Sequence, residues 1–510
     1  MANENVANDT TSITPEEEQE LQQSIRRVAD SWLVKTILEV IAEHRNLNVA
    51  QADLCDLDDS VIEALNRGMT RNPDKERMAL RRILRALEAQ LKTRFVGQDE
   101  LVRTAVISLV LNEHALLEGL PGTGKTVFVQ WLAETAGLPF SRVQFIPDML
   151  PSDLIGKDHI DPVGLAKGDR SAVRWNNGPV FGSIVLADEI NRAPSKVQAA
   201  LLEAMGERQA TPFGKMSRPV LSPLHEAALQ VWNETPASQG RGLIGTPRPI
   251  PANRGGFKEY APFIVLATMN PIEQEGTYPL SEAQLDRFCF KVIVPYPSRG
   301  TYDTLAESVY TNPPFQAVDL NLSAAKCRQF LERHPKFAVP LLLPVYFFLK
   351  CRSHIVPVRL CDHPSRYQQL QGDKVLERIF DLVYMTNARS SRLGEAEARI
   401  GWYEKEQADM REFLSGCSPP ERADKLRRIR DQQVSQYVKS GASPRGFLKL
   451  LPAVLCHAMF RETGTVENED ILATVYNVLR HRIHLDVHAR LAGVNTEQII
   501  QNVCQHILGS

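Results

Sequence analysis

Apolar residues recur at helical spacing near both ends of the chain, and short apolar runs lie between these regions. Thr14, Pro15 and Glu17 predict an N-cap, a first-turn proline and a capping box at the start of a helix. Residues 1–13 are small, polar and acidic, so we expect them to be disordered. The pattern therefore predicts a helical N-terminal extension over residues 1–92, whose apolar stripes we interpret as core.

Between residues 93 and 298, helical patterns alternate with short apolar runs that predict β-strands. These runs are Ala115–Leu117, Val143–Phe145, Ile184–Ala187 and Phe263–Ala267. Strands separated by helices predict a parallel sheet with helices on both faces, which belongs to the α/β class. A proline- and glycine-rich segment, residues 211–262, lies between the last two strands. Its length and composition predict either a mobile surface element that meets a partner or disorder.

From residue 299 to residue 510 helical patterns dominate, which predicts an α-helical C-terminal domain. The most apolar run, Ala338–Leu349, contains two prolines and is too short to span a bilayer, so we expect a buried helix or turn and no membrane insertion. A net charge of −2 argues against a globally basic nucleic-acid binder. Eight scattered cysteines and a polar N-terminus lead us to expect a reducing, cytoplasmic location.

A glycine-rich loop follows the first predicted strand, and a helical pattern follows the loop. Strand, loop and helix in this order are the context of a P-loop, because glycines let backbone N–H groups point at phosphate oxygens. Lys125 is expected to reach the β- and γ-phosphates of a nucleotide, and Thr126 to offer its hydroxyl to Mg²⁺. The predicted nucleotide-binding residues are Gly119, Pro121, Gly122, Thr123, Gly124, Lys125, Thr126 and Val127.

Polar side chains follow two of the later strands. Asp188 and Glu189 come directly after the third strand, and Asn270 follows the fourth. Ligands bind at the carboxyl ends of strands in open α/β sheets. We therefore expect Asp188 to hold Mg²⁺ and Glu189 to polarise a water that attacks the γ-phosphate. Asn270 is expected to orient that water, although an asparagine after a strand is by itself usually a turn former.

Two arginines are candidates to complete such a site. Arg287 has the guanidinium that a nucleotide bound between subunits needs to stabilise charge on the transferred phosphoryl group. The alternative is an Asp–Arg surface pair, which contributes little. Arg445 opens a helix in the C-terminal region and is expected to report the nucleotide state to that domain.

A cluster of cysteines and histidines also lies in the C-terminal region. Its spacing is not usual for zinc, and the apolar residues between the side chains look like strand or core, so we favour a structural segment over a metal site. The four residues are Cys351, His354, Cys361 and His363.

Taken together, these motifs resemble the AAA+ ATPases, and specifically the MoxR family. Beyond the P-loop, the likeness lies in residues 144–153, 186–205, 267–288, 441–445 and 480–483. It implies an AAA+ P-loop NTPase fold with a helical lid, ATP and Mg²⁺ as cofactors, and a homo-oligomeric, usually hexameric ring with ATP at subunit interfaces. The roles that it implies are Walker A for Lys125 and Thr126, Walker B for Asp188 and Glu189, sensor 1 for Asn270, arginine finger for Arg287 and sensor 2 for Arg445.

The resemblance also implies partners. Members of the family are thought to be chaperone-like remodellers that commonly work with von Willebrand factor A domain proteins, so we predict an ATP-hydrolysing motor with a protein client. The family's branch has one extra hairpin near residues 178–181 and another before sensor 1. This chain departs from the compact form in its prefix, in residues 211–262, and in an insertion at about residues 334–425 of the lid.

Two other functions are compatible with the sequence. The basic bias of residues 211–262 favours a nucleic-acid-stimulated motor, whose turnover would respond to DNA at low salt. A nucleotide-gated scaffold would assemble with ATP but hydrolyse little of it.

Overall fold

The computed structural model describes residues 13–45, 73–95, 97–160, 173–211, 218–220, 222–234, 262–271, 277–296, 324–355, 375–386, 437–461 and 465–508. The chain divides into two compact units. The first comprises residues 1–280 and 292–352, and the second comprises residues 281–291 and 353–510.

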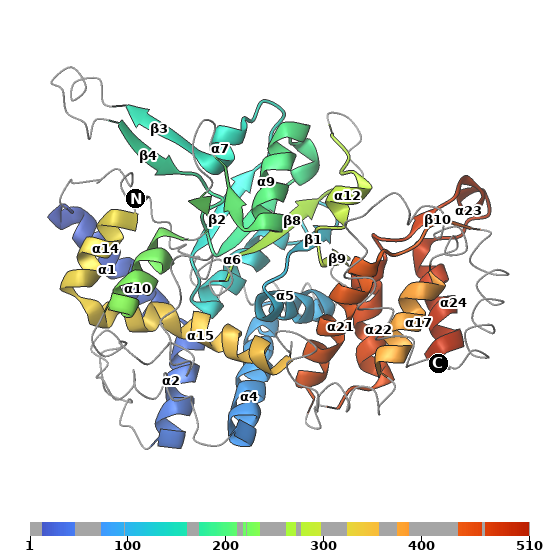
Figure 1. Ribbon diagram of the computed structural model, residues 1–510, viewed down its shortest axis with the longest axis horizontal. Helices are drawn as coiled ribbons and strands as arrows, with labels where there is room; N and C mark the ends of the chain where they lie inside the picture. Colours follow the sequence, from blue (N-terminus) through green and yellow to red (C-terminus); the bar gives the residue numbers. More distant parts are fainter. Residues whose placement is uncertain are drawn as a thin grey trace, which may run out of the picture. The chain divides into compact units, whose positions relative to one another are not determined.

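A five-stranded sheet organises the first unit (Figure 1). Its strands, in the order β2-β5-β8-β1-β9, are β2 (Phe140–Gln144), β5 (Ile184–Asp188), β8 (Ile264–Met269), β1 (Ala115–Glu118) and β9 (Phe290–Ile293). The pairs β2–β5, β5–β8 and β8–β1 are parallel. The parallel sheet and all four predicted strands are therefore confirmed, and β9 is a strand that the sequence did not reveal.

Helices of the N-terminal extension belong to the first unit. They are α1 (Pro15–Ala29), α2 (Trp32–Arg45) and α4 (Pro73–Lys92), and α2 and α4 both contact α6 (Lys125–Ala136), the helix after the glycine-rich loop. The capping box predicted at Thr14 is present: its Oγ1 accepts a hydrogen bond from the backbone N–H of Glu17, and Glu17 Oε2 accepts one from the N–H of Thr14. The remaining helices near the sheet are α5 (Asp99–Leu111), α7 (Pro151–Ile155), η2 (Ile190–Arg192) and α9 (Ser195–Glu207).

Three later helices join the first unit. They are α10 (Pro223–Glu234), α14 (Ala324–Arg333) and most of α15 (Ala338–Ile355), with η4 (Pro335–Phe337) between the last two. α14 packs on α10, and Lys326 Nζ lies 2.6 Å from Glu17 Oε1 of α1. α15 buries Tyr346, Phe347 and Phe348, which confirms the buried helix predicted there. These contacts place residues up to 352 in the first unit, whereas the sequence suggested that the lid starts at residue 299.

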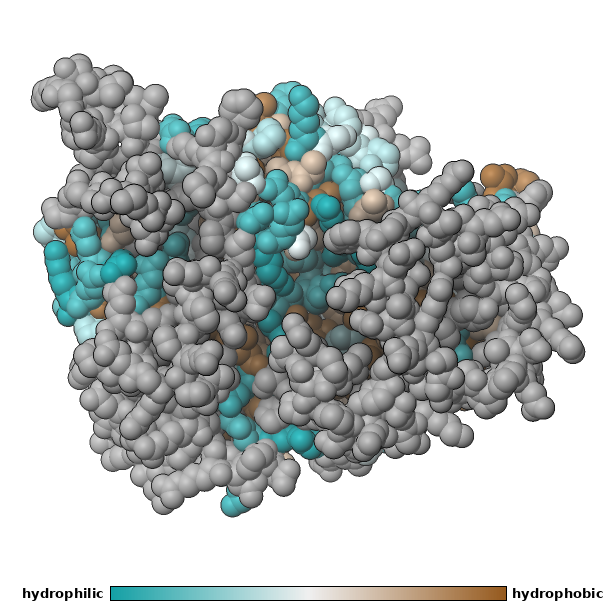
Figure 2. Space-filling view, in the orientation of Figure 1, coloured by the Kyte–Doolittle hydropathy of each residue, from teal (hydrophilic) through white to brown (hydrophobic). Residues whose placement is uncertain are grey.

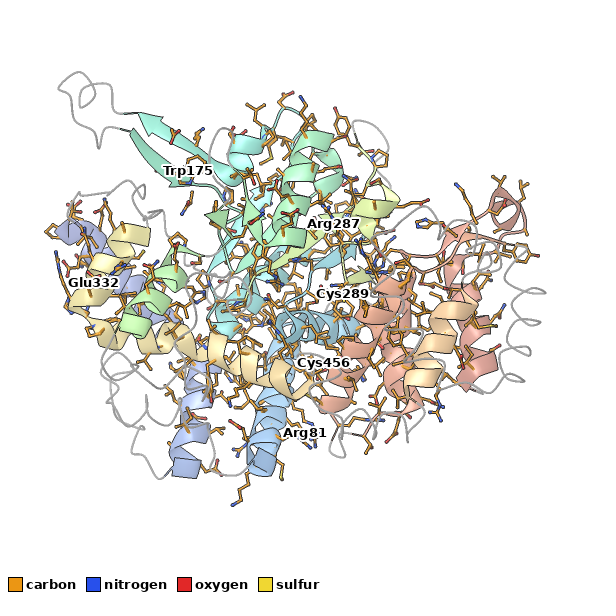
Figure 3. All side chains as sticks on the ribbon, viewed as in Figure 1. Arg81, Trp175, Arg287, Cys289, Glu332 and Cys456 are labelled. Atoms are coloured by element: carbon orange, nitrogen blue, oxygen red, sulfur yellow. The ribbon has the colours of Figure 1, made fainter. Side chains whose placement is uncertain are left out.

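The described part of the first unit also contains two short antiparallel pairs. β3 (Gly156–Ile160) pairs with β4 (Val173–Asn177), and β6 (Gln209–Ala210) pairs with β7 (Arg218–Pro219). Figure 3 shows Trp175 on β4, where its Nε1 donates a hydrogen bond to Asn177 Oδ1. The two pairs lie just before residue 178 and before β8, where the family resemblance implied extra hairpins.

In the described ranges, the second unit is a helical bundle with a small two-stranded sheet. Its elements are α12 (Glu282–Leu285), α17 (Val375–Met385), β10 (Val438–Ser440), α21 (Pro444–Met459), α22 (Asn468–Leu479), β11 (His484–Leu485), α23 (Val487–Leu491) and α24 (Thr496–Leu508). α21 packs on α22 and α17, and β10 pairs antiparallel with β11. Figure 2 shows a hydrophobic surface over α23, where Val487 and Leu491 are 65% and 81% exposed.

Several expectations fall on residues outside the described ranges. These include residues 1–12 of the segment 1–13 that was predicted to be disordered, whose last residue, Ile13, is described and buried, and most of residues 211–262 and 334–425. Cys361 and His363 also lie outside, whereas Cys351 is buried in α15. Among the described residues, no group of three or more His, Cys, Asp or Glu side chains is placed to hold a metal ion. No helix in the described ranges has the length and apolar character needed to cross a membrane.

Candidate nucleotide-binding site

The loop between β1 and α6 carries the glycine-rich motif. Gly122 and Gly124 have φ angles of +81° and +78°, a left-handed conformation that glycine adopts readily. A Cβ at Gly119 would lie 2.6 Å from the backbone oxygen of Val294, so the side chain of any other residue would displace the adjoining chain. α6 begins at Lys125, and the positive end of its dipole therefore lies at the loop. The loop has the geometry of an anion-binding turn.

Lys125 is held over this loop by oxygen acceptors. Its Nζ donates hydrogen bonds to the backbone oxygens of Gly119, at 2.6 Å, and Leu120, at 2.8 Å, and to Thr123 Oγ1 at 3.2 Å. Burial lowers the pKa of the Lys125 ammonium, and the negative charges of Asp188 and Glu189 oppose that shift. The ammonium of Lys125 therefore lies close enough to Asp188 and Glu189, the two predicted acidic residues, to interact with both electrostatically.

Asp188, at the end of β5, is a buried carboxylate with three partners. Its Oδ2 lies 2.8 Å from Arg142 Nη2 and accepts a hydrogen bond of 3.3 Å from Thr126 Oγ1. Its Oδ1 accepts a hydrogen bond of 2.6 Å from Thr268 Oγ1. The structure thus brings together the two predicted Mg²⁺ ligands, Thr126 and Asp188. A hydroxyl and a carboxylate oxygen are the hard donors that suit Mg²⁺, and the Arg142 contact shows that a cation is compatible with this position.

Glu189 follows in a left-handed backbone conformation, with φ of +58°. Such a conformation is uncommon for a residue with a side chain and is often found at functional sites. The backbone N–H of Glu189 donates to Thr268 Oγ1 at 2.9 Å. Its Oε2 lies 2.8 Å from Gln144 Nε2 and 3.2 Å from Arg192 Nε. Gln144 of β2 and Arg192 of η2 therefore fix the carboxylate, and Thr268 of β8 holds the backbone N–H.

Asn270 lies at the same edge of the sheet. β8 runs between β5 and β1, with Ala267 opposite Ala187 and Met269 opposite Glu118. Asn270 is the residue after this strand and is buried. The carboxyl ends of three parallel strands therefore meet here, which places Asn270 between the P-loop and the two acidic residues in the order of the sheet.

The two predicted arginines belong to the second unit. Arg287 is exposed and follows α12 (Figure 3), and Arg445 lies in the first turn of α21 with its side chain 53% exposed. Arg445 Nη1 lies 3.4 Å from Asp286 Oδ2, so it neighbours the residue that precedes Arg287. Within this unit the structure thus brings the segment of Arg287 and the guanidinium of Arg445 together.

Sequence reasoning missed four residues that contact the carboxylates: Arg142, Gln144, Arg192 and Thr268. Arg142 and Gln144 are two positions apart on β2, so their side chains face the same way. The register then sets Gln144 opposite Asp188. The alternation is visible in the sequence, but the adjacency of β2 and β5 is not.

Two family models match the chain. The ATPase family associated with various cellular activities (AAA) matches residues 114–234 and 248–290, and the AAA lid domain matches residues 430–503. The first match includes the P-loop, both carboxylates, Asn270 and Arg287, and the second includes Arg445.

Similarity to individual proteins covers more of the chain. Chaperone MoxR1 of Mycobacterium tuberculosis is 29% identical over 418 residues, which is 82% of this chain and 80% of that protein. The uncharacterised protein YeaC of Bacillus subtilis is 28% identical over 408 residues, or 80% of this chain and 89% of that one. A crystal structure of a candidate ATPase from Cytophaga hutchinsonii matches with a TM-score of 0.56 and 27% identity, and the match covers 85% of this chain and 96% of the other.

Proposed function

Because the chain belongs to the MoxR family of AAA+ ATPases, we propose that it hydrolyses ATP in an oligomeric ring and thereby remodels a protein partner. One observation carries the proposal: the hydroxyl of Thr126 lies 3.3 Å from the carboxylate of Asp188, next to a P-loop whose lysine is in place. Each of these groups has a use in phosphoryl transfer, and they come from two separate parts of the sequence, the P-loop and the end of β5.

The P-loop binds the phosphates of ATP. Its backbone N–H groups and the start of α6 attract the negative oxygens, and Lys125 exchanges the carbonyls of Gly119 and Leu120 for the β- and γ-phosphates. Thr126 and Asp188 are the residues that would hold Mg²⁺, which neutralises phosphate charge when bound.

Glu189 acts as the general base. As the oxygen of water bonds to the γ-phosphorus, its proton passes to the carboxylate, and the bond from the γ-phosphorus to the bridging oxygen breaks with its electrons left on ADP. Gln144 and Arg192 both contact Oε2, so we assign Oε1 to the water. Asn270 orients the water from the neighbouring strand, and Arg287 of an adjacent subunit stabilises the charge of the transferred group.

The client of this motor is a protein. This part of the proposal is supported by the relative named as a chaperone, MoxR1, and by the family resemblance, which points to a von Willebrand factor A domain protein. Arg445, at the start of α21 in the second unit, senses the nucleotide and passes its state to the lid.

The substitution Glu189→Gln tests the proposal. It should abolish phosphate release, retain ATP binding and trap the client on the assembled ring, which a pull-down with ATP would identify. If wild-type protein assembled with ATP and released no phosphate, the result would favour a nucleotide-gated scaffold over a motor. Strong stimulation of ATP turnover by DNA at low salt would favour nucleic acid over a protein as the client.

A further inference from the structure

One buried side chain of the second unit holds the segment that carries Arg287. Arg482 follows α22, and its side chain is only 1% exposed. We propose that Arg482 is a positioning residue for Arg287: it fixes the backbone on both sides of Arg287 and so sets the direction in which that guanidinium projects. This inference rests on the proposed function, in which Arg287 acts on the nucleotide of a neighbouring subunit.

The hydrogen bonds of Arg482 are concentrated on this one segment. Its Nε donates to Asp286 Oδ1 at 2.9 Å. Its Nη2 donates to the backbone oxygens of Asp286, at 3.1 Å, and Phe288, at 2.7 Å. Its Nη1 donates to the oxygen of Cys289 at 3.1 Å and to that of Val478 in α22. Four of the five N–H groups therefore bind Asp286, Phe288 and Cys289, which flank Arg287 in the sequence.

The chemistry of this anchor requires an arginine. A guanidinium offers five N–H groups in a rigid plane, so it can bind oxygens on both sides of Arg287 at once. An ammonium offers three donors from a single atom and cannot span the same acceptors. A buried guanidinium is stable only when its donors are satisfied, and here every one has an oxygen partner.

The surroundings of Arg482 make the anchor rigid. His481 is buried, and its Nε2 lies 2.9 Å from the oxygen of Phe288, which adds a second tether to the segment. Burial, with the charge of Arg482, lowers the pKa of His481 well below its usual value, so the ring is neutral. A Cβ at Gly446 of α21 would lie 3.2 Å from the Cβ of Ala442 and 3.5 Å from Cδ of Arg482, so α21 packs closely against this side chain.

Asp286 shows which of its two arginine contacts can be exchanged. Its Oδ1 binds the buried Arg482 at 2.9 Å, and its Oδ2 lies 3.4 Å from the half-exposed Arg445. An exposed ion pair is weak, so Arg445 can leave Asp286 for a nucleotide at little cost. Arg482 keeps its other bonds when this happens. The segment of Arg287 therefore stays anchored while Arg445 changes partner.

The test compares two lysine substitutions at neighbouring arginines. Arg482→Lys keeps the charge but loses the planar set of donors. Arg480→Lys is the matched control, because Arg480 is also largely buried, pairs with Glu497 at 3.2 Å and ends the same helix. ATP affinity, read with a fluorescent ATP analogue, should stay within about threefold of wild type in both proteins. The value of kcat should fall at least about tenfold in Arg482→Lys, as it should in Arg287→Ala. It should stay near the wild-type value in Arg480→Lys.

A mixing experiment separates positioning from a general structural role. Subunits with Glu189→Gln are inactive but carry an intact Arg287. When they are mixed with Arg482→Lys subunits, they should restore turnover at the sites of the latter. A merely destabilised lid would not be rescued in this way.

The possible failures can be told apart. Turnover by Arg482→Lys equal to that of Arg480→Lys, or a loss that mixing does not rescue, overturns the inference alone when Arg287→Ala is itself inactive. Full activity of Arg287→Ala overturns the assignment of the arginine finger and this inference with it.

Discussion

Substitution of Thr268 gives a specific test of the site, because its one buried hydroxyl is hydrogen-bonded to both acidic residues. Its Oγ1 donates to Asp188 Oδ1 at 2.6 Å and accepts from the backbone N–H of Glu189 at 2.9 Å. Thr268 is 1% exposed, so Thr268→Val preserves the shape and leaves both partners without this hydroxyl. A buried donor without its acceptor costs about 1–3 kcal/mol, and a hydrogen bond to a charged group contributes about 1.5–3 kcal/mol.

Asp188 keeps Arg142 and Thr126, so we expect a total near the lower end of that sum, about 2.5–4 kcal/mol. The loss should appear as a melting temperature lower by roughly 5–10 °C and as a kcat reduced at least about tenfold, because Glu189 loses its backbone tether. The assays are thermal unfolding and phosphate release at saturating ATP and Mg²⁺.

Thr268→Ser is the matched control. It keeps the hydroxyl and removes one buried methyl group, which costs about 1 kcal/mol. If Thr268→Val were as stable and as active as Thr268→Ser, the hydroxyl would have no role in holding the two carboxylates.

Three further predictions follow from contacts in the first unit. Arg142→Gln removes a cation that competes for Asp188, an ion pair contributing up to about 1 kcal/mol, so half-maximal turnover should need about two- to fivefold less Mg²⁺ in a metal titration; an unchanged requirement would contradict this. Burial lowers the pKa of His225 to about 4 from 6.5, so the unfolded chain binds the extra proton first as the pH falls. The free energy of unfolding should therefore fall by up to about 3 kcal/mol between pH 6.5 and pH 4. Melting curves of His225→Gln should depend less on pH. Gly119→Ala places a Cβ 2.6 Å from the oxygen of Val294, so ATP affinity should fall at least about tenfold in a binding titration, and wild-type affinity would show that the loop tolerates the shift.

The parallel sheet and the motif-bearing strand ends could be predicted because both are local patterns. An apolar run before Gly119, and another before Asp188 and Glu189, identify buried strands of a sheet with helices on both faces. β9, residues 290–293, is only four residues long and lies close behind α12 without a distinct turn signal, so periodicity did not reveal it.

Contacts between distant parts of the chain could not be predicted. Arg142 meets Asp188 only because β2 pairs with β5, and the order of strands is not written in either strand. Arg482 lies almost two hundred residues after Asp286, and a single arginine after a helix gives no signal of its partner. Local spacing thus predicts the binding and catalytic side chains, whereas strand order and packing decide which other side chains contact them and hold them in place.

In the proposed function, Glu189 activates water at an ATP site built on the P-loop. The direct measurement is the identity of the nucleotide that remains on Glu189→Gln protein after incubation with ATP and Mg²⁺, rapid desalting, acid quenching and chromatography. We expect intact ATP on the variant, ADP on wild-type protein and no retained nucleotide on Lys125→Ala. ADP formed on Glu189→Gln at the wild-type rate would contradict this role of Glu189.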